Sequence, residues 1–226
     1  MRAHILQHTI NTTPGSTLEW LKRQNIPCTF TNFFKPNPVL PDLSTFDFLI
    51  ICGGEMNVDE EKKYPWLKAE KDFIKKALDK NKKIVGLCLG GQLMAEVLGA
   101  RVGPHKSWEV GWQQVELKPL PSFNLPLTPA LMAFQYHGYS FDTPPGAFQF
   151  ARSEACEHQG FLWKTRALAL QFHPESTKEW VLECAKETLP TGRYVQTASQ
   201  MIEGNKNQTQ LQTWYFNLLT ALMMVE

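Results

Sequence analysis

Residues 83–98 read KIVGLCLGGQLMAEVL, and this stretch decides the fold class. Its first part, Lys83–Leu87, is a short apolar run of the kind that a buried parallel strand shows. The second part, Leu89–Leu98, predicts a helix, and Gly99 follows at the position where helices commonly end. A strand that passes into a helix through a single cysteine predicts an α/β architecture.

Cys88 stands at the turn between this strand and this helix, within the pattern Gly-x-Cys-x-Gly. The pattern is typical of a nucleophile elbow, in which a sharp turn holds the nucleophile in a strained backbone conformation. Gly86 and Gly90 meet its need for flanking residues without side chains. The positive end of the helix would favour thiolate over thiol, and the N–H of Leu89 would point at a developing oxyanion. A motif of this length also surrounds packed, inert cysteines, so the rest of the site decides between the two interpretations.

A candidate base for this thiol follows a second apolar run late in the chain, where residues 171–175 read QFHPE. A thiol nucleophile needs an imidazole to take up its proton, and the imidazole needs an acceptor that fixes its tautomer. Residues two apart in an extended segment point to the same side, so Glu175 is expected to reach the His173 ring. Pro174 restricts the backbone between them. We therefore predict a catalytic triad of Cys88, His173 and Glu175.

Strands and helices alternate on both sides of the elbow. Their order predicts a doubly wound, mostly parallel central sheet flanked by helices, a flavodoxin-like three-layer arrangement, in a single domain over residues 1–226. Prolines interrupt Val102–Phe161, which is expected to be a small antiparallel β insertion with short strands such as Gln113–Leu117 and Ala147–Arg152. The other expected strands are Ala3–His8, Cys28–Phe33, Phe46–Cys52 and Leu168–Phe172, and the other expected helices are Gly15–Gln24 (with Ser16 or Thr17 as N-cap), Tyr64–Asn81, Lys178–Glu187 and Leu211–Met224.

Composition and charge argue against several classes of function. The 226 residues carry a formal net charge of +1, which gives no electrostatic reason to expect nucleic acid or an anionic membrane as a partner. Five cysteines, without a Cys-x-x-Cys pair, predict neither a disulfide framework nor a structural zinc site. His4 and His8 lie on a strand-like segment that does not suit a metal site. With no secretory signal and no membrane span expected, the sequence predicts a cytoplasmic protein without metal or cofactor.

At these motifs the chain resembles the class I (triad-type) glutamine amidotransferases, whose pattern is a Gly-x-Cys-x-Gly-x-Gln elbow followed much later by His-Pro-Glu. The resemblance extends to residues 64–67, 84–102, 109–112 and 137–141, and it is strongest to stand-alone, GMP-synthase-like members, a group that includes plant γ-glutamyl peptidases. It implies an oxyanion hole made by the N–H groups of Gly54 and Leu89. Gly91 departs from the histidine that many amidotransferases have there. The substrate contacts that the resemblance implies are Gly53, Gln92 and a loop with His137, Gly138 and Tyr139.

The resemblance implies a hydrolase that releases ammonia from the side-chain amide of glutamine through a γ-glutamyl thioester on Cys88. γ-Glutamyl peptides or conjugates are the alternative substrates, and a catalytically silent regulatory or binding protein is the alternative of a different class. His137 as a second base is a further alternative, although residues 171–175 already supply a base with its own carboxylate. Because the sequence has no P-loop, a true amidotransferase would need a synthetase on a separate chain. The apolar stripe of the C-terminal helix is expected to be core, with a homodimer contact as the alternative.

Overall fold

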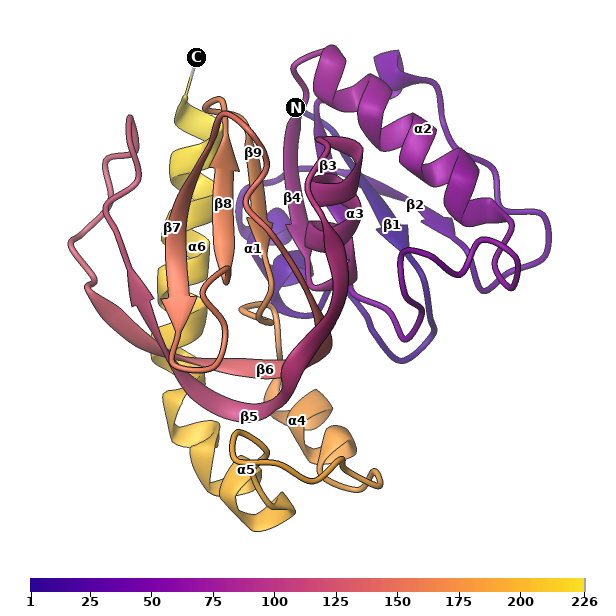
Figure 1. Ribbon diagram of the computed structural model, residues 1–226. Coiled ribbons are helices and arrows are strands. Elements are labelled where there is room, and N and C mark those ends of the chain that lie inside the picture. The colour runs from indigo at the N-terminus through magenta and orange to yellow at the C-terminus, as the bar shows by residue number, and fades with distance from the viewer. Residues whose placement is uncertain (226) are drawn as a thin grey trace.

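The computed structural model describes residues 1–225 and contains a nine-stranded sheet (Figure 1). Its strands lie in the order β2-β1-β3-β4-β9-β8-β7-β5-β6. The first five run parallel to one another, as the alternation of strands and helices predicts for a doubly wound fold. These parallel strands are β1 (Ala3–Gln7), β2 (Cys28–Asn32), β3 (Phe48–Ile51), β4 (Lys83–Leu87) and β9 (Ala167–Leu170).

Helices cover both faces of the parallel strands, and each face has its own hydrophobic core (Figure 1). Alternate residues of a strand point to opposite faces. In β3 the side chains of Phe48 and Ile50 therefore enter the first core. Those of Leu49 and Ile51 enter the second, so this strand is apolar throughout. The helices on the first face are α1 (Ser16–Arg23) and α6 (Gln208–Met224), and those on the second are α2 (Trp66–Asp79) and α3 (Leu89–Val97).

Four antiparallel strands extend the same sheet beyond β9, and two of them are much longer than the sequence predicts. β5 has 16 residues and β6 has 12, and both run along the lower part of the molecule in Figure 1. The expectation of short, proline-interrupted strands is wrong because most of the prolines lie in the connections at 118–129 and 142–146. Pro104 does lie within β5, where the pairing shifts register. The strands are β5 (Val102–Leu117), β6 (Ala130–Phe141), β7 (Ala147–Ser153) and β8 (Gly160–Trp163).

The segment between β9 and α6 is more helical than the sequence predicts. α4 ends at Cys184, short of the expected Glu187. α5 is an unexpected helix, although it begins with a capping box in which Thr197 and Gln200 bond each other's backbone N–H groups. The short elements here and earlier in the chain are α4 (Lys178–Cys184), α5 (Ala198–Gly204) and the 3₁₀ segments η1 (Leu43–Thr45) and η2 (Asn205–Asn207).

The apolar stripe of α6 lies in the core, as predicted. Leu211, Tyr215 and Leu218 are fully buried in the cluster that α6 shares with α1 and the sheet. The Tyr215 hydroxyl is 3.0 Å from the Thr17 hydroxyl of α1, so the two helices are also joined by a polar contact. The homodimer contact stays a prediction.

All five cysteines are free thiols, and four of them are buried. Cys52, beside the glycine loop, packs in the core as a small apolar residue. Within residues 1–225, no helix combines the length and the apolar character needed to cross a membrane.

Candidate active site

Three neighbouring parallel strands end at one edge of the sheet, and each delivers part of the candidate site. β3 leads into Gly53, β4 into Cys88 and β9 into His173. Ligands of doubly wound sheets bind outside the carboxyl ends of the strands. A Cβ atom on Gly53 would lie 3.0 Å from His173 Cε1 and 3.6 Å from Cys88 Cβ. The structure therefore brings the predicted nucleophile, the predicted base and the glycine loop into one niche.

Cys88 has the strained backbone that the elbow motif predicts. Its φ of 50° and ψ of −108° are unusual for a residue with a side chain, and it caps the N-terminus of α3. A Cβ on Gly86 would lie 2.6 Å from the backbone of Gly90, and a Cβ on Gly90 would lie 2.3 Å from the carbonyl oxygen of Ile51. Both glycines are thus required by close backbone contacts.

His173 and Glu175 form a buried pair, with His173 Nδ1 2.7 Å from Glu175 Oε1. The predicted contact is present, but the reason given for it is wrong, because residues 173–176 form a turn and not an extended segment. The N–H of Ser176 donates to the carbonyl oxygen of His173 at 3.3 Å and closes this turn. The ring of Trp180 lies 4.8 Å from the His173 ring, centroid to centroid, and fills the space beside it.

The neighbours of His173 determine its protonation. Burial by itself lowers the pKa of His173 because it disfavours the charged ring, whereas the Glu175 carboxylate and the Cys88 side chain raise it. The net effect raises the pKa of His173 to about 10, so that the ring is protonated at neutral pH. An imidazolium beside a cysteine stabilises the thiolate form of the sulfur.

The start of α1 holds the backbone of Glu175 in place. The N–H of Ser16 donates to the carbonyl oxygen of Glu175 at 2.8 Å. Gly15 has a φ of 49°, and a Cβ there would lie only 2.1 Å from the same oxygen. Gly15 is the N-cap of α1 and no side chain caps the helix, so the predicted cap at Ser16 or Thr17 is wrong. Gly15, which precedes α1, has no side chain because the backbone of Glu175 passes against it.

Gln92 lies near the elbow, where the resemblance places it. Its amide nitrogen donates to the carbonyl oxygen of Tyr139 and to Gln171 Oε1, each at 3.2 Å. Gln171 in turn donates through Nε2 to Cys88 Sγ at 3.6 Å. Sequence reasoning missed Gln171, although it begins the QFHPE segment that also supplies the predicted base.

His137 lies on β6, and the expectation that residues 137–141 form a loop is wrong. Its Nδ1 donates to the carbonyl oxygen of Tyr139 at 3.0 Å, and its Nε2 lies 3.2 Å from Glu109 Oε2. Glu109 is fully buried, and the sequence patterns do not assign it to the site. A Cβ on Gly138 would lie 2.5 Å from the indole of Trp108, so this glycine lets the indole pack against β6.

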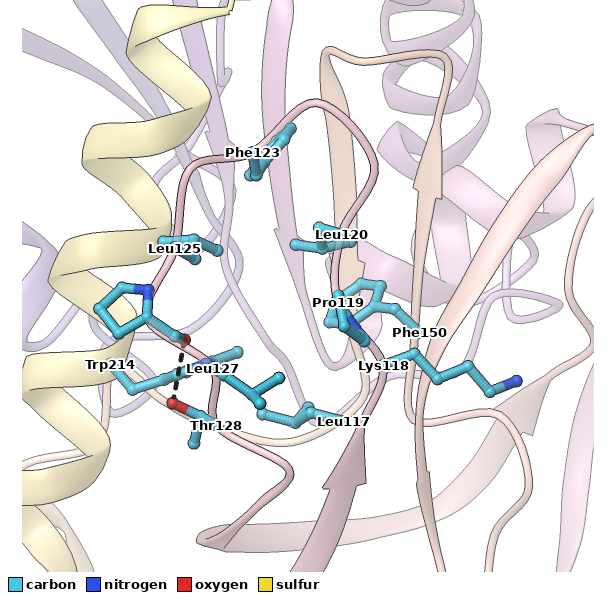
Figure 2. Close-up of a pocket in the computed structure, with 11 residues that line it drawn as sticks. Leu117, Lys118, Pro119, Leu120, Phe123, Leu125, Leu127, Thr128, Phe150 and Trp214 are labelled. Atoms are coloured by element: carbon cyan, nitrogen blue, oxygen red, sulfur yellow. Dashed lines mark hydrogen bonds between the residues drawn. The ribbon is translucent and has the colours of Figure 1, made fainter.

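A cavity of about 830 Å³ opens at this niche, and Cys88 and His173 line it. Gly54, Gln92, His137, Gly138 and Tyr139 line it as well, whereas Gly53, Leu89 and Glu175 lie behind this lining. A smaller cavity of about 80 Å³ lies between Leu125, Phe150 and Trp214 (Figure 2), and its lining is mostly apolar and contains no triad residue. Within residues 1–225, no group of three or more His, Cys, Asp or Glu side chains is arranged to hold a metal ion.

Comparison with known proteins assigns the family. Residues 16–180, which span the elbow and the His-Pro-Glu segment, match the family model for class I glutamine amidotransferases. The chain belongs to this family.

Similar proteins align with more than half of this chain. The glutamine amidotransferase-like protein YfeJ of Salmonella typhimurium is 25% identical over 236 residues, or 96% of this chain and 95% of YfeJ. One subunit of the glutamine-hydrolysing GMP synthase of Thermoplasma acidophilum is 34% identical over 136 residues, or 59% of this chain and 66% of that subunit. The crystal structure of a glutamine amidotransferase from Thermotoga maritima has a TM-score of 0.87 at 28% identity, covering 100% of this chain and 99% of that one. The predicted fold is confirmed.

Proposed function

We propose that this class I amidotransferase is a thiol hydrolase that releases ammonia from the side-chain amide of glutamine. Cys88 would be the nucleophile, His173 the general acid and base, and Glu175 the group that orients His173. One observation supports this most directly: a cysteine on a strained elbow shares its niche with an imidazole that is held by a buried carboxylate at 2.7 Å. A nucleophile, a base and an orienting group in this order define a catalytic triad.

The reaction begins with attack of the Cys88 sulfur on the amide carbon of the substrate. The C–S bond forms, and the negative charge moves to the carbonyl oxygen. When the C–N bond breaks, His173 gives its proton to the departing nitrogen, which leaves as ammonia. Water then adds to the γ-glutamyl thioester and gives a proton to His173, and glutamate leaves as Cys88 is restored. The high pKa of His173 suits the first half of this cycle, because the ring starts out protonated.

Backbone and side-chain groups around the cavity would bind the substrate. The N–H groups of Gly54 and Leu89 would stabilise the tetrahedral oxyanion, since Leu89 follows Cys88 at the start of α3 and Gly54 lies against Leu89 and lines the same cavity as Cys88. The other contacts that we propose for the amino-acid end of the substrate are Gly53, Gln92, His137, Gly138 and Tyr139. Gln92 and His137 already bond the backbone of Tyr139, so they act chiefly by shaping this wall.

The size of the cavity favours a second substrate class. At about 830 Å³ it has the volume of sites that hold drug-sized ligands, about 300–1,000 Å³, and free glutamine is smaller than such ligands. Trp108, Tyr139 and Leu189 line the cavity and offer apolar surface to a leaving group larger than ammonia. γ-Glutamyl peptides or conjugates are therefore the alternative substrates for the same triad.

The proposal extends to partners and location. If glutamine is the substrate, ammonia would pass to a synthetase on a separate chain, and the Thermoplasma relative is itself named as one subunit of a synthase. We propose one domain over residues 1–226, because strands from both halves of the chain build one sheet. Five free cysteines support a reducing, cytoplasmic location.

Substitution of the nucleophile tests this function. We expect Cys88→Ser to abolish the release of glutamate from glutamine and from γ-glutamyl dipeptides, and to abolish labelling of the niche by iodoacetamide. Cys28→Ser is the matched control, because Cys28 begins β2 near the outer edge of the sheet. Wild-type release from only one of the two substrates would decide between them. If the wild type releases glutamate from neither, the proposal is wrong, and the regulatory or binding alternative gains support. If Cys88→Ser keeps wild-type activity, Cys88 is not the nucleophile and the proposed mechanism is wrong.

A further inference from the structure

A second histidine–glutamate pair lies directly behind the glycine loop. His8 follows β1, and its Nε2 is 2.8 Å from Oε1 of Glu70 on α2. Both side chains are completely buried. The ring of His8 packs beside Phe33 and Trp66, whose centroids lie 5.5 and 5.6 Å from its own and 4.4 Å from each other. The mechanism proposed above leaves this pair without a role.

The other ring nitrogen of His8 is bonded to the glycine loop. Nδ1 lies 2.9 Å from the carbonyl oxygen of Gly53, and because a carbonyl can only accept, Nδ1 carries a proton. Burial lowers the pKa of His8, but the charge and the hydrogen bond of Glu70, together with hydrogen bonds to the backbone of Gly53 and Cys52, raise it more, so the net pKa lies above the ordinary value. The second oxygen of Glu70 has no hydrogen-bond partner within residues 1–225, so His8 is the group that offsets its charge.

This bond fixes the direction of one peptide group. The carbonyl of Gly53 and the N–H of Gly54 belong to the same trans peptide, so they point in opposite directions. With the carbonyl held by His8, the N–H of Gly54 points away from His8. Gly54 lines the cavity beside Cys88, and a Cβ on it would lie 2.8 Å from Leu89 Cδ2 and 3.0 Å from His8 Cβ. A glycine here has few steric limits on φ and ψ, so the peptide could turn without such an anchor.

We propose that His8 and Glu70 are positioning residues that hold the Gly53–Gly54 peptide with its N–H directed at the oxyanion, so that the buried pair sets the oxyanion hole without touching the substrate. The inference rests on the proposed function. Glu70 orients the His8 ring, and His8 orients the peptide. Orientation of a donor before the reaction is what gives an oxyanion hole its effect, since no reorganisation is then needed in the transition state.

Two single substitutions separate the peptide anchor from the charge pair. In His8→Gln the amide nitrogen stands near the position of Nε2, so the bond to Glu70 is kept and the anchor on Gly53 is lost. In Glu70→Gln a neutral His8 keeps its Nδ1–H on Gly53 and accepts at Nε2 from the new amide. We expect kcat to fall about 10- to 100-fold in His8→Gln, with KM within about twofold, because the oxyanion forms only in the transition state. Glu70→Gln should stay within about threefold of the wild-type kcat.

Thiol chemistry and a rescue variant distinguish positioning from a structural effect. Alkylation of Cys88 by iodoacetamide does not use the oxyanion hole, so its rate in His8→Gln should equal that of the wild type. His8→Asn/Glu70→Gln restores a donor near the Nδ1 position and should recover most of the lost kcat. If His8→Gln does not fold, the same rescue variant is compared with His8→Leu/Glu70→Leu, which replaces the pair by apolar side chains.

Several results would overturn this role. They are an unchanged kcat in a folded His8→Gln, an equal loss in alkylation rate and kcat, or equal kcat values in the two double variants. A wild type that hydrolyses no γ-glutamyl substrate refutes the proposed function, and the inference with it. If the wild type is active and His8→Gln has the same kcat, the inference is refuted but the proposed function is not.

Discussion

Replacement of Gly90 by alanine tests the packing on which the elbow depends. Gly90 is the second residue of α3, and a Cβ there would lie 2.3 Å from the carbonyl oxygen of Ile51 and 2.8 Å from its carbon. Both neighbours are backbone atoms, so no side chain can turn away to make room. Ordinary contact begins near 3.4 Å, and α3 must therefore move away from β3 by about 1.1 Å.

The movement has consequences for stability and for catalysis. Overpacking of this kind costs about 1–3 kcal/mol, and in a protein of this size each kcal/mol lowers Tm by about 2–4 °C, so we expect a fall of about 2–12 °C. Ile51 leads into Gly53, and Gly90 follows Cys88 by two residues, so the same shift separates the sulfur from the glycine loop. A displacement of about 1 Å between reacting groups lowers the rate by about 100-fold.

Gly103→Ala is the matched control for this experiment. Gly103 lies in β5, and a Cβ there would meet no atom within 4 Å, at a φ that any residue adopts. We expect its free energy of unfolding to stay within about 0.5 kcal/mol of the wild type. Thermal unfolding followed by circular dichroism and the release of glutamate are measured for both variants. A Gly90→Ala protein as stable and as active as Gly103→Ala would refute the steric reasoning.

Two further predictions concern His173 and the helix beside it. The folded pKa of His173, about 10, lies above its ordinary value of 6.5, so the stabilisation that it contributes is complete below pH 6.5 and is lost as the pH rises toward 10. Glu175→Gln should remove most of this pH dependence, as measured by urea unfolding between pH 6.5 and 10. It should also lower kcat by about 10²- to 10⁴-fold. Equal pH dependence in the wild type and the variant would contradict the pairing. Thr177 caps α4 by accepting from the N–H of Trp180 at 3.2 Å, so Thr177→Ala should cost about 1 kcal/mol, or about 2–4 °C in Tm. Thr177→Ser keeps the cap and should keep the wild-type Tm, and equal losses in both variants would exclude capping as the cause.

The sequence predicts the elbow well because everything that it needs is local. Gly86, Cys88 and Gly90 lie within five residues, and each has a steric or chemical reason that the sequence alone makes plain. The central parallel strands β3 and β9 are predicted for a similar reason, since a strand buried on both faces is apolar throughout. The contact of Glu175 with His173 is predicted for the wrong reason, because a local turn brings together two residues that an extended chain would also have placed on one side.

Long-range features are the ones that the sequence conceals. β5 pairs with both β6 and β7, and its length depends on partners that begin 13 or more residues after its own end. Glu70 is 62 residues from His8, and within the predicted helix 64–81 it looks like one more charged residue on a solvated face. Glu109 lies far from His137 in the sequence and is concealed for the same reason. No local pattern marks such pairs, because it is the tertiary fold that buries them.

The three buried histidines near the cavity differ in one respect that bears on the choice of base. Each lies beside a glutamate: His8 beside Glu70, His137 beside Glu109, and His173 beside Glu175. In His8 both ring nitrogens are hydrogen-bonded, so this ring has none left to exchange a proton with a substrate. In His137 Nδ1 is bonded to a backbone carbonyl, and Nε2 makes no hydrogen bond within residues 1–225 but faces the buried Glu109 carboxylate. In His173 the Glu175 carboxylate is bonded to Nδ1, and the rest of the ring contacts Cys88. A base must have one nitrogen held and the other free for the reacting group, and His173 meets that condition beside Cys88.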